Sequence, residues 1–207
     1  FAGGMNLFEY SVSSPVMMVD AAGLDPWGDS TVSAPLGIKG FSITGNPGEL
    51  AALNLALAQL MTTKTGRYLI NQLSESGVQI NLIIRENIRL KNGKRVKGVT
   101  ADLGFERDCN GDYRLKVPRL TLAFDLDYIR SESMPGGFDA FLRNVLAHEL
   151  GHAYQDVFHP NDVIWGRIIG QTERYAVEQW ERAIKVEYNK NMGTWPSSVP
   201  DRRPDIK

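Results

Sequence analysis

Five consecutive residues, His148-Glu149-Leu150-Gly151-His152, have the types and spacing needed to bind a metal ion and to move a proton. They fit the pattern H-E-x-x-H, in which two histidines lie four positions apart on one face of a helix and can reach one zinc ion. The glutamate between them is then placed to take a proton from an attacking water molecule. Apolar residues around the motif recur at helical spacing: Phe141, Leu142, Val145, Leu146 and Ala153. The stretch therefore predicts a helical Zn²⁺ site with His148 and His152 as ligands and Glu149 as the catalytic residue.

A surface helix that carries this pattern by chance is the simplest alternative. However, the chain has only three histidines, and two of them stand at the ligand spacing. The apolar surroundings predict a partly buried helix, in which unpaired imidazole and carboxylate groups would be costly. Gly151 costs about 1 kcal/mol within a helix relative to alanine, which indicates close packing or a site. These features favour the zinc site.

A catalytic zinc site needs a third protein ligand and one open coordination position. The remaining histidine, His159, lies one position beyond the third ligand of the longer pattern H-E-x-x-H-x-x-G-x-x-H. Because Pro160 follows it, His159 is expected to end the helix instead. Asp156, one helical turn after His152, is an alternative ligand.

Glu173 is the favoured third ligand, on a helix expected over residues 172–189. The apolar face of this helix comprises Ala176, Val177, Trp180, Ala183, Ile184 and Tyr188. Glu173 shares that face by helical spacing, and an inward carboxylate is costly unless a metal ion or another partner binds it. Glu178 and Glu181 are expected on the solvated side. The alternative for Glu173 is a helix-start glutamate that the helix dipole favours.

Helix and strand signals outside the motif predict an α+β fold. Helices are expected at residues 47–61 and 66–75, strands at 78–90, 95–105 and 119–127, and the motif helix at 138–158. Asn46 and Glu49 form a capping-box signature for the first helix, and Thr65 is the expected cap of the second. Asn92-Gly93 predicts a hairpin turn between the first two strands. The sheet is therefore expected to be small and mainly antiparallel, with strand 119–127 as the edge that a substrate follows.

Composition limits the classes of protein to which the chain can belong. It has 207 residues, 43% of them hydrophobic and 23% charged, as in ordinary globular domains. The formal net charge of −1 provides no field that would attract nucleic acid or an anionic membrane. No apolar stretch is long enough to span a membrane, and the single cysteine, Cys109, lies in a turn-like segment. No secretory signal is visible, and the first residue, Phe1, indicates a fragment or a processed product.

Residues 1–24 form a second motif-bearing stretch. Phe1-Ala2-Gly3-Gly4-Met5-Asn6-Leu7-Phe8-Glu9-Tyr10 is followed by Ser13-Ser14-Pro15-Val16 and Val19-Asp20-Ala21-Ala22-Gly23-Leu24. This series resembles the end of the RHS-repeat-associated core, in which a repeat-built shell precedes a variable C-terminal toxin.

The resemblance implies a self-cleavage element with Asp20 as its aspartate and Leu24 before the scissile bond. Ala21 stands where the family usually has proline, and Asp25-Pro26-Trp27-Gly28 offers a second candidate. Residues 25–45, rich in Pro, Gly and Ser, are expected to form a linker. Residues 46–207 are then the toxin domain.

The motif, together with Glu173-Arg174-Tyr175-Ala176-Val177, resembles the metallopeptidase family of the secreted effector protease NleD over residues 43–189. Members of that family also occur as C-terminal toxins of RHS proteins. The resemblance implies a zincin-like, gluzincin-type zinc metallopeptidase with His148, His152 and Glu173 as ligands and Glu149 as catalytic acid and base. It also implies that a larger RHS protein is secreted and delivers the domain into a target cell, where the substrate is a protein. The expected partners are the RHS shell and a cognate immunity protein, with no nucleic acid.

Two other functions are consistent with the motif: a non-proteolytic zinc hydrolase, such as a deamidase or a cell-wall amidase, and a degenerate zincin module that only binds. The intact Glu149 argues against a binding module, because a structural metal site has no need of a base. The residue that would stabilise an oxyanion is left open among Tyr154, Tyr175 and Tyr188.

Overall fold

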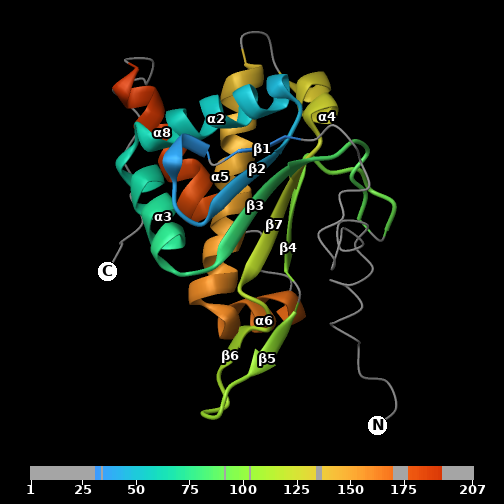
Figure 1. Ribbon diagram of the computed structural model, residues 1–207, viewed down its shortest axis with the longest axis vertical. Coiled ribbons are helices and arrows are strands. Elements are labelled where there is room, and N and C mark those ends of the chain that lie inside the picture. The colour runs from blue at the N-terminus through green and yellow to red at the C-terminus, as the bar shows by residue number, and fades with distance from the viewer. Residues whose placement is uncertain are drawn as a thin grey trace.

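The computed structural model describes residues 31–192 except 34, 91, 103, 134–136 and 170–176. The self-cleavage element with Asp20 and Leu24, the expected ligand Glu173 and Tyr175 all lie outside the described residues. Within these residues a five-stranded sheet packs against helices, in agreement with the predicted α+β class (Figure 1). No helix in this described part of the chain is long and apolar enough to cross a membrane.

The sheet is mixed, so the expectation of a mainly antiparallel sheet is wrong. Its strands are, in spatial order, β1 (Thr31–Ser33), β2 (Phe41–Gly45), β3 (Gln79–Ile84), β7 (Arg119–Phe124) and β4 (Gly98–Asp102). The neighbours β2, β3 and β7 are parallel, whereas β1 and β4 run antiparallel at the two edges. A separate two-stranded sheet contains β5 (Phe105–Arg107) and β6 (Tyr113–Leu115). The predicted edge strand 119–127 corresponds to β7, which is interior; the edge strand beside it is β4.

Part of the segment expected to be a linker belongs to the sheet. Residues 41–45 form β2, in which buried and half-buried positions alternate. Phe41 and Ile43 are buried against the helices, as the period of two in a strand requires. The folded domain therefore begins before residue 46.

The Asn92-Gly93 turn forms, but it does not join two paired strands of the sheet. The Leu90 N–H donates to the Lys94 carbonyl at 2.9 Å, and a single bridge links Arg89 and Arg95. Instead of pairing with β3, β4 pairs with the other side of β7. Between β3 and β4, Ile88 and Val96 pack on the opposite face of the sheet, where Ile88 is buried against Ala123.

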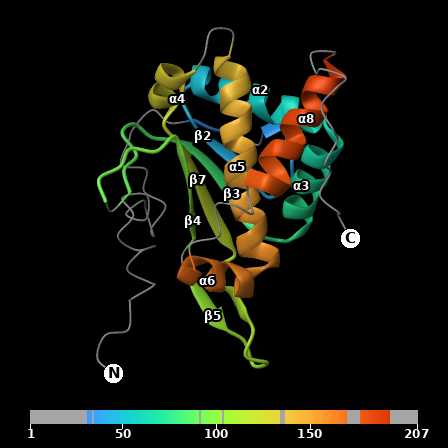
Figure 2. The ribbon, with the colours of Figure 1, turned by 180° about the vertical axis from the view of Figure 1, so that it is seen from behind.

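Helices on one face of the sheet enclose the main core. Their bounds, with those of the other helical segments, are η2 (Pro35–Gly37), α2 (Pro47–Met61), α3 (Lys64–Glu75), α4 (Leu126–Glu132), α5 (Phe138–Phe158), α6 (Pro160–Ile169), the π-helix η3 (Val177–Glu181) and α8 (Arg182–Asn191). Figures 1 and 2 show α2, α3, α5 and α8 on the same face. Side chains that are fully buried between these layers include Ile43, Leu57, Leu69, Ile80, Leu122 and Leu146. Among these helices, α5 runs the length of the sheet.

The capping box of α2 is confirmed, but the predicted cap of α3 is wrong. Asn46 and Glu49 exchange hydrogen bonds at 2.8 and 3.1 Å. Thr63, rather than Thr65, accepts from the Gly66 N–H and caps α3. Thr65 instead donates both its N–H and its hydroxyl to the Glu187 carboxylate, at 2.9 and 2.6 Å. This pair ties α8 to the start of α3.

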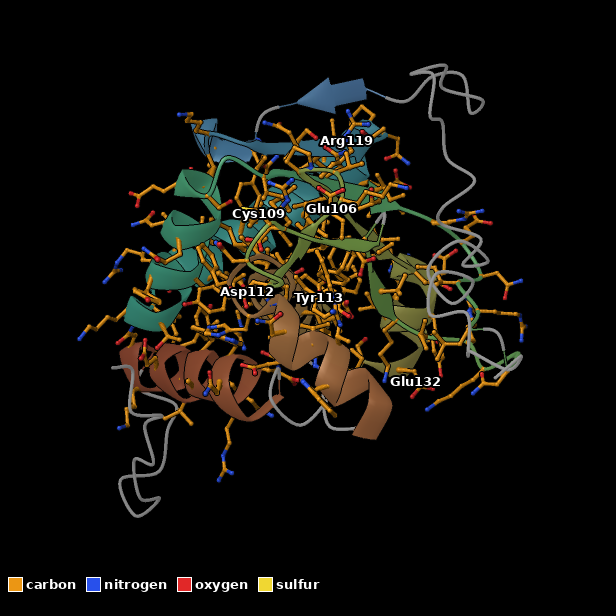
Figure 3. All side chains as sticks on the ribbon, turned by 90° about the horizontal axis from the view of Figure 1, so that it is seen from below. Glu106, Cys109, Asp112, Tyr113, Arg119 and Glu132 are labelled. Atoms are coloured by element: carbon orange, nitrogen blue, oxygen red, sulfur yellow. The ribbon has the colours of Figure 1, made fainter. Side chains whose placement is uncertain are left out.

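The hairpin of β5 and β6 docks on α6 (Figure 3). Asn161 accepts from the Tyr113 N–H at 2.9 Å and donates to the Asp112 carboxylate at 3.0 Å. Cys109 is exposed in the connecting turn, in agreement with the turn predicted around it. The small sheet is thus fixed at the end of the molecule where α5 ends.

Asp125, which directly follows β7, is a buried carboxylate that binds residues of the connection between β3 and β4. It accepts two hydrogen bonds from the Arg95 guanidinium at 2.8 Å and one each from the N–H groups of Ile88 and Tyr128. Burial is the largest influence on its pKa and raises it. The hydrogen bonds from Arg95, Tyr128 and Ile88, together with the positive charge of Arg95, outweigh burial, so the pKa of Asp125 lies below its ordinary value.

The lowered pKa predicts how stability depends on pH. A carboxyl group whose folded pKa is depressed contributes stability above its unfolded pKa of about 3.9, and this is lost as pH falls through the folded pKa. Asp125→Asn should therefore lower the free energy of unfolding at pH 7 by about 1–3 kcal/mol. The difference from wild type should shrink below about pH 4. Urea denaturation at a series of pH values from about 2 to 7 measures both.

The matched control is Asp127→Asn in the first turn of α4, which Asp125 caps; its exposed pair with Arg130 should contribute no more than about 0.5 kcal/mol. Equal losses of unfolding free energy in the two variants would contradict the stabilising role of the Asp125 carboxylate. So would a difference between Asp125→Asn and wild type that persists unchanged to about pH 2.

Candidate metal centre

The motif lies on α5, as predicted, in the middle of a helix that is buried on several sides. One stripe of the helix, at spacings of three and four, is fully buried in the main core and comprises Leu142, Leu146, Leu150 and Ala153. The motif side chains leave the helix on other sides, where β4 and η3 pack against it. The buried stripe therefore fixes the rotation of α5 and with it the direction of the motif residues.

The two histidines converge through their Nε2 atoms. The atoms lie 3.1 Å apart, and the ring planes are inclined by 78°. Two nitrogen ligands of one tetrahedral zinc ion, each at a distance of roughly 2.0–2.1 Å, stand about 3.3 Å apart. The separation in the structure therefore fits a pair of ligands to a single metal ion. No group of three metal-ligating side chains occurs among the described residues, which do not include Glu173.

Behind His148 lies the carboxylate of Glu181, at the end of η3. Its Oε2 atom is 3.3 Å from His148 Nδ1. Because a carboxylate accepts hydrogen bonds, this contact favours the tautomer in which Nδ1 carries the proton and Nε2 presents its lone pair. Glu181 is therefore placed to orient His148.

The expectation that Glu181 lies on the solvated side is therefore wrong. Its side chain is 30% exposed and faces the motif helix. The segment from Val177 to Glu181 is a π-helix, whose wider turn changes the angular position of each residue relative to an α-helix. The predicted burial of Trp180 and Ile184 is confirmed. Glu181 precedes Ile184 by three positions and Tyr188 by seven, so regular helical spacing also places it on their face.

Glu149 is buried between α5 and the edge strand β4. It is 5% exposed, and the Thr100 hydroxyl lies 2.8 Å from its Oε2 atom. At Gly98, an added Cβ would lie only 2.9 Å from Glu149 Cγ, so the strand could not approach as closely with a larger residue. The structure thus adds to the motif carboxylate a threonine hydroxyl that carries no sequence signal.

The segment that carries Glu181 is held by contacts on two sides. Glu187 binds the start of α3, and the Tyr188 ring lies 3.8 Å from the guanidinium carbon of Arg143 on α5. Burial lowers the pKa of Arg143, and Tyr188 acts in the opposite direction. These contacts fix α8, and therefore the end of η3, relative to the motif.

The other predicted candidates have distinct surroundings. His159 is the C-cap of α5, as predicted, and its Nδ1 atom lies 3.8 Å from the Asp162 carboxylate. Asp156 is buried on α5. Tyr154 packs in an aromatic cluster whose other members are Tyr68, Phe158, His159 and Trp180.

The described centre thus combines two imidazoles and a carboxylate of α5 with the Thr100 hydroxyl of β4 and the Glu181 carboxylate of η3. Comparisons of the chain with protein-family models, with curated proteins and with solved structures found no match.

Removal of the Glu181 carboxylate should weaken metal binding without abolishing it. Loss of a carboxylate that orients a metal-ligating histidine typically costs about 10- to 100-fold in metal affinity. Glu181→Ala should therefore raise the zinc dissociation constant by that factor, as measured by competition with a chelator at constant pH. Glu75→Ala, an exposed change on α3, is the control. Wild-type affinity in the Glu181 variant would exclude this role.

Proposed function

We propose that this chain is a zinc-dependent endopeptidase of zincin-like fold, with His148, His152 and Glu173 as ligands and Glu149 as general acid and base. The observation that carries the proposal is the convergence of His148 Nε2 and His152 Nε2 at 3.1 Å beside the buried Glu149. When bound, zinc would acidify a water molecule and polarise the scissile carbonyl. Glu149 would accept a proton from the attacking water and return it to the leaving amine.

A polypeptide substrate is supported by the position of β4. This strand is an edge of the sheet, and among the described residues no strand pairs with its outer side. An extended peptide can add to such an edge through main-chain hydrogen bonds. Because Gly98 and Thr100 lie against Glu149, a peptide on this edge would pass beside the carboxylate. The edge strand β4 thus takes the role first expected for strand 119–127.

The biological context is proposed from the sequence of residues 1–24. Their resemblance to the end of an RHS core supports a C-terminal toxin that is released by self-cleavage near Asp20 and Leu24 and acts on a protein in a target cell. Delivery as part of a larger secreted protein, a surrounding RHS shell and a cognate immunity protein belong to the same proposal.

Glu149→Gln tests the chemistry. The variant should bind zinc with wild-type stoichiometry, whereas its kcat should fall by about 10²- to 10⁴-fold because the proton-transfer group is lost. Mass spectrometry of a lysate treated with each protein should detect new internal protein termini with wild type only. Amide hydrolysis without new internal termini would replace the endopeptidase by a deamidase or a cell-wall amidase.

The third ligand is tested by metal analysis of Glu173→Ala beside its neighbour Glu178→Ala. A site reduced from three protein ligands to two should lose most of its zinc after dialysis, so only the Glu173 variant should be depleted. Zinc retained in both variants would exclude Glu173 and return the choice to Asp156 or His159.

A further inference from the structure

One face of β4 is shaped around Glu149. Gly98 and Thr100 are two positions apart in the strand, so they occupy the same face. Both lie against Glu149 of α5. Strand β4 and helix α5 run side by side (Figure 2). The intervening residue, Val99, packs on the opposite face with Ile88 and Ala123.

The Thr100 hydroxyl has two acceptors, and both belong to Glu149. It lies 2.8 Å from the Oε2 atom of the side chain and 2.9 Å from the main-chain carbonyl oxygen. A hydroxyl has one proton to donate, so the two acceptors share it. Because threonine is branched at Cβ and its χ1 is restricted, the strand fixes the direction of this hydroxyl.

Gly98 confines the same carboxylate from a second direction. An added Cβ would lie 3.0 Å from Glu149 Oε1 and 3.1 Å from Val145 Cγ1, both tighter than ordinary van der Waals contact. The hydrogen atom of Gly98 therefore leaves just enough space for the Glu149 side chain between β4 and α5.

We infer that Thr100 is a positioning residue for Glu149 and that Gly98 supplies the space this position requires. This inference rests on the proposed function. Thr100 donates to the carboxylate before the proton is transferred. Once Glu149 carries the proton, the hydroxyl can donate to the main-chain carbonyl and accept from the side chain. The Thr100 hydroxyl therefore has an acceptor both before and after Glu149 is protonated. The Glu149 side chain stays against β4 throughout the reaction.

Substitution of the hydroxyl separates positioning from folding. Thr100→Val keeps the shape of the side chain but removes the donor, whereas Thr100→Ser keeps the donor. Loss of the hydrogen bond to the charged carboxylate should lower kcat by about 10- to 100-fold in the valine variant. KM and zinc affinity should stay close to wild type, and serine should restore most of kcat. Thr121→Val on β7 is the matched control, because Thr121 pairs with Ala101 and points to the opposite face from Thr100.

A second measurement does not depend on activity. In metal-free protein labelled at glutamate carboxylates, the ¹³C resonance of Glu149 can be assigned by its disappearance in Glu149→Gln. It should be unchanged in Thr100→Ser and should shift or broaden in both Thr100→Val and Gly98→Ala. If the valine variant does not fold, the serine and Gly98→Ala variants make the same comparison.

The outcomes distinguish this inference from the proposed function. Wild-type kcat together with an unchanged Glu149 resonance in Thr100→Val would overturn the positioning role, as would an unchanged resonance in Gly98→Ala. A resonance that responds as expected in a protein that cleaves no polypeptide would support the positioning of Glu149 and refute the endopeptidase.

Discussion

The close approach of β4 to α5 is the constraint on which the candidate centre depends. With a side chain at Gly98, a Cβ atom would stand 2.9 Å from Glu149 Cγ, so the strand and the helix could not keep their present separation. That separation places the Thr100 hydroxyl within 2.8 Å of the Glu149 carboxylate. The same strand is an edge of the sheet, and in the described part of the chain no strand pairs with its outer side, so the feature that holds the carboxylate also presents a main-chain edge beside it.

Helix α5 shows how a buried element can carry polar chemistry. Glu149, Gln155 and Asp156 are all at most 5% exposed, although isolated buried polar groups are unfavourable. For Glu149 the cost is offset by Thr100, and His148 gains a carboxylate partner in Glu181. The apolar stripe on the remaining side of the helix supplies hydrophobic stabilisation that makes these polar positions tolerable.

Sequence reasoning succeeded for most local interactions, with the exception of the α3 cap, which is Thr63 rather than Thr65. The Asn46 and Glu49 capping box and the motif helix depend on residues three or four positions apart, and both are confirmed. Strand partners depend on distant segments, so the Asn92-Gly93 turn could be predicted but the insertion of β7 between β3 and β4 could not. Glu181 was misplaced although it precedes Ile184 by three positions and Tyr188 by seven, so regular helical spacing already sets it on their face.

The hydrogen bonds between Thr65 and Glu187 affect the order in which the parts of the centre fold. These residues are separated by 122 positions, so the contact closes a long loop and is entropically expensive until both segments have folded. Glu181 lies on the same segment as Glu187 and reaches His148 only when that segment has docked. During synthesis from the N-terminus, the motif helix emerges before its supporting carboxylate. The centre is therefore assembled last, and a partly emerged chain holds His148 without the group that orients it.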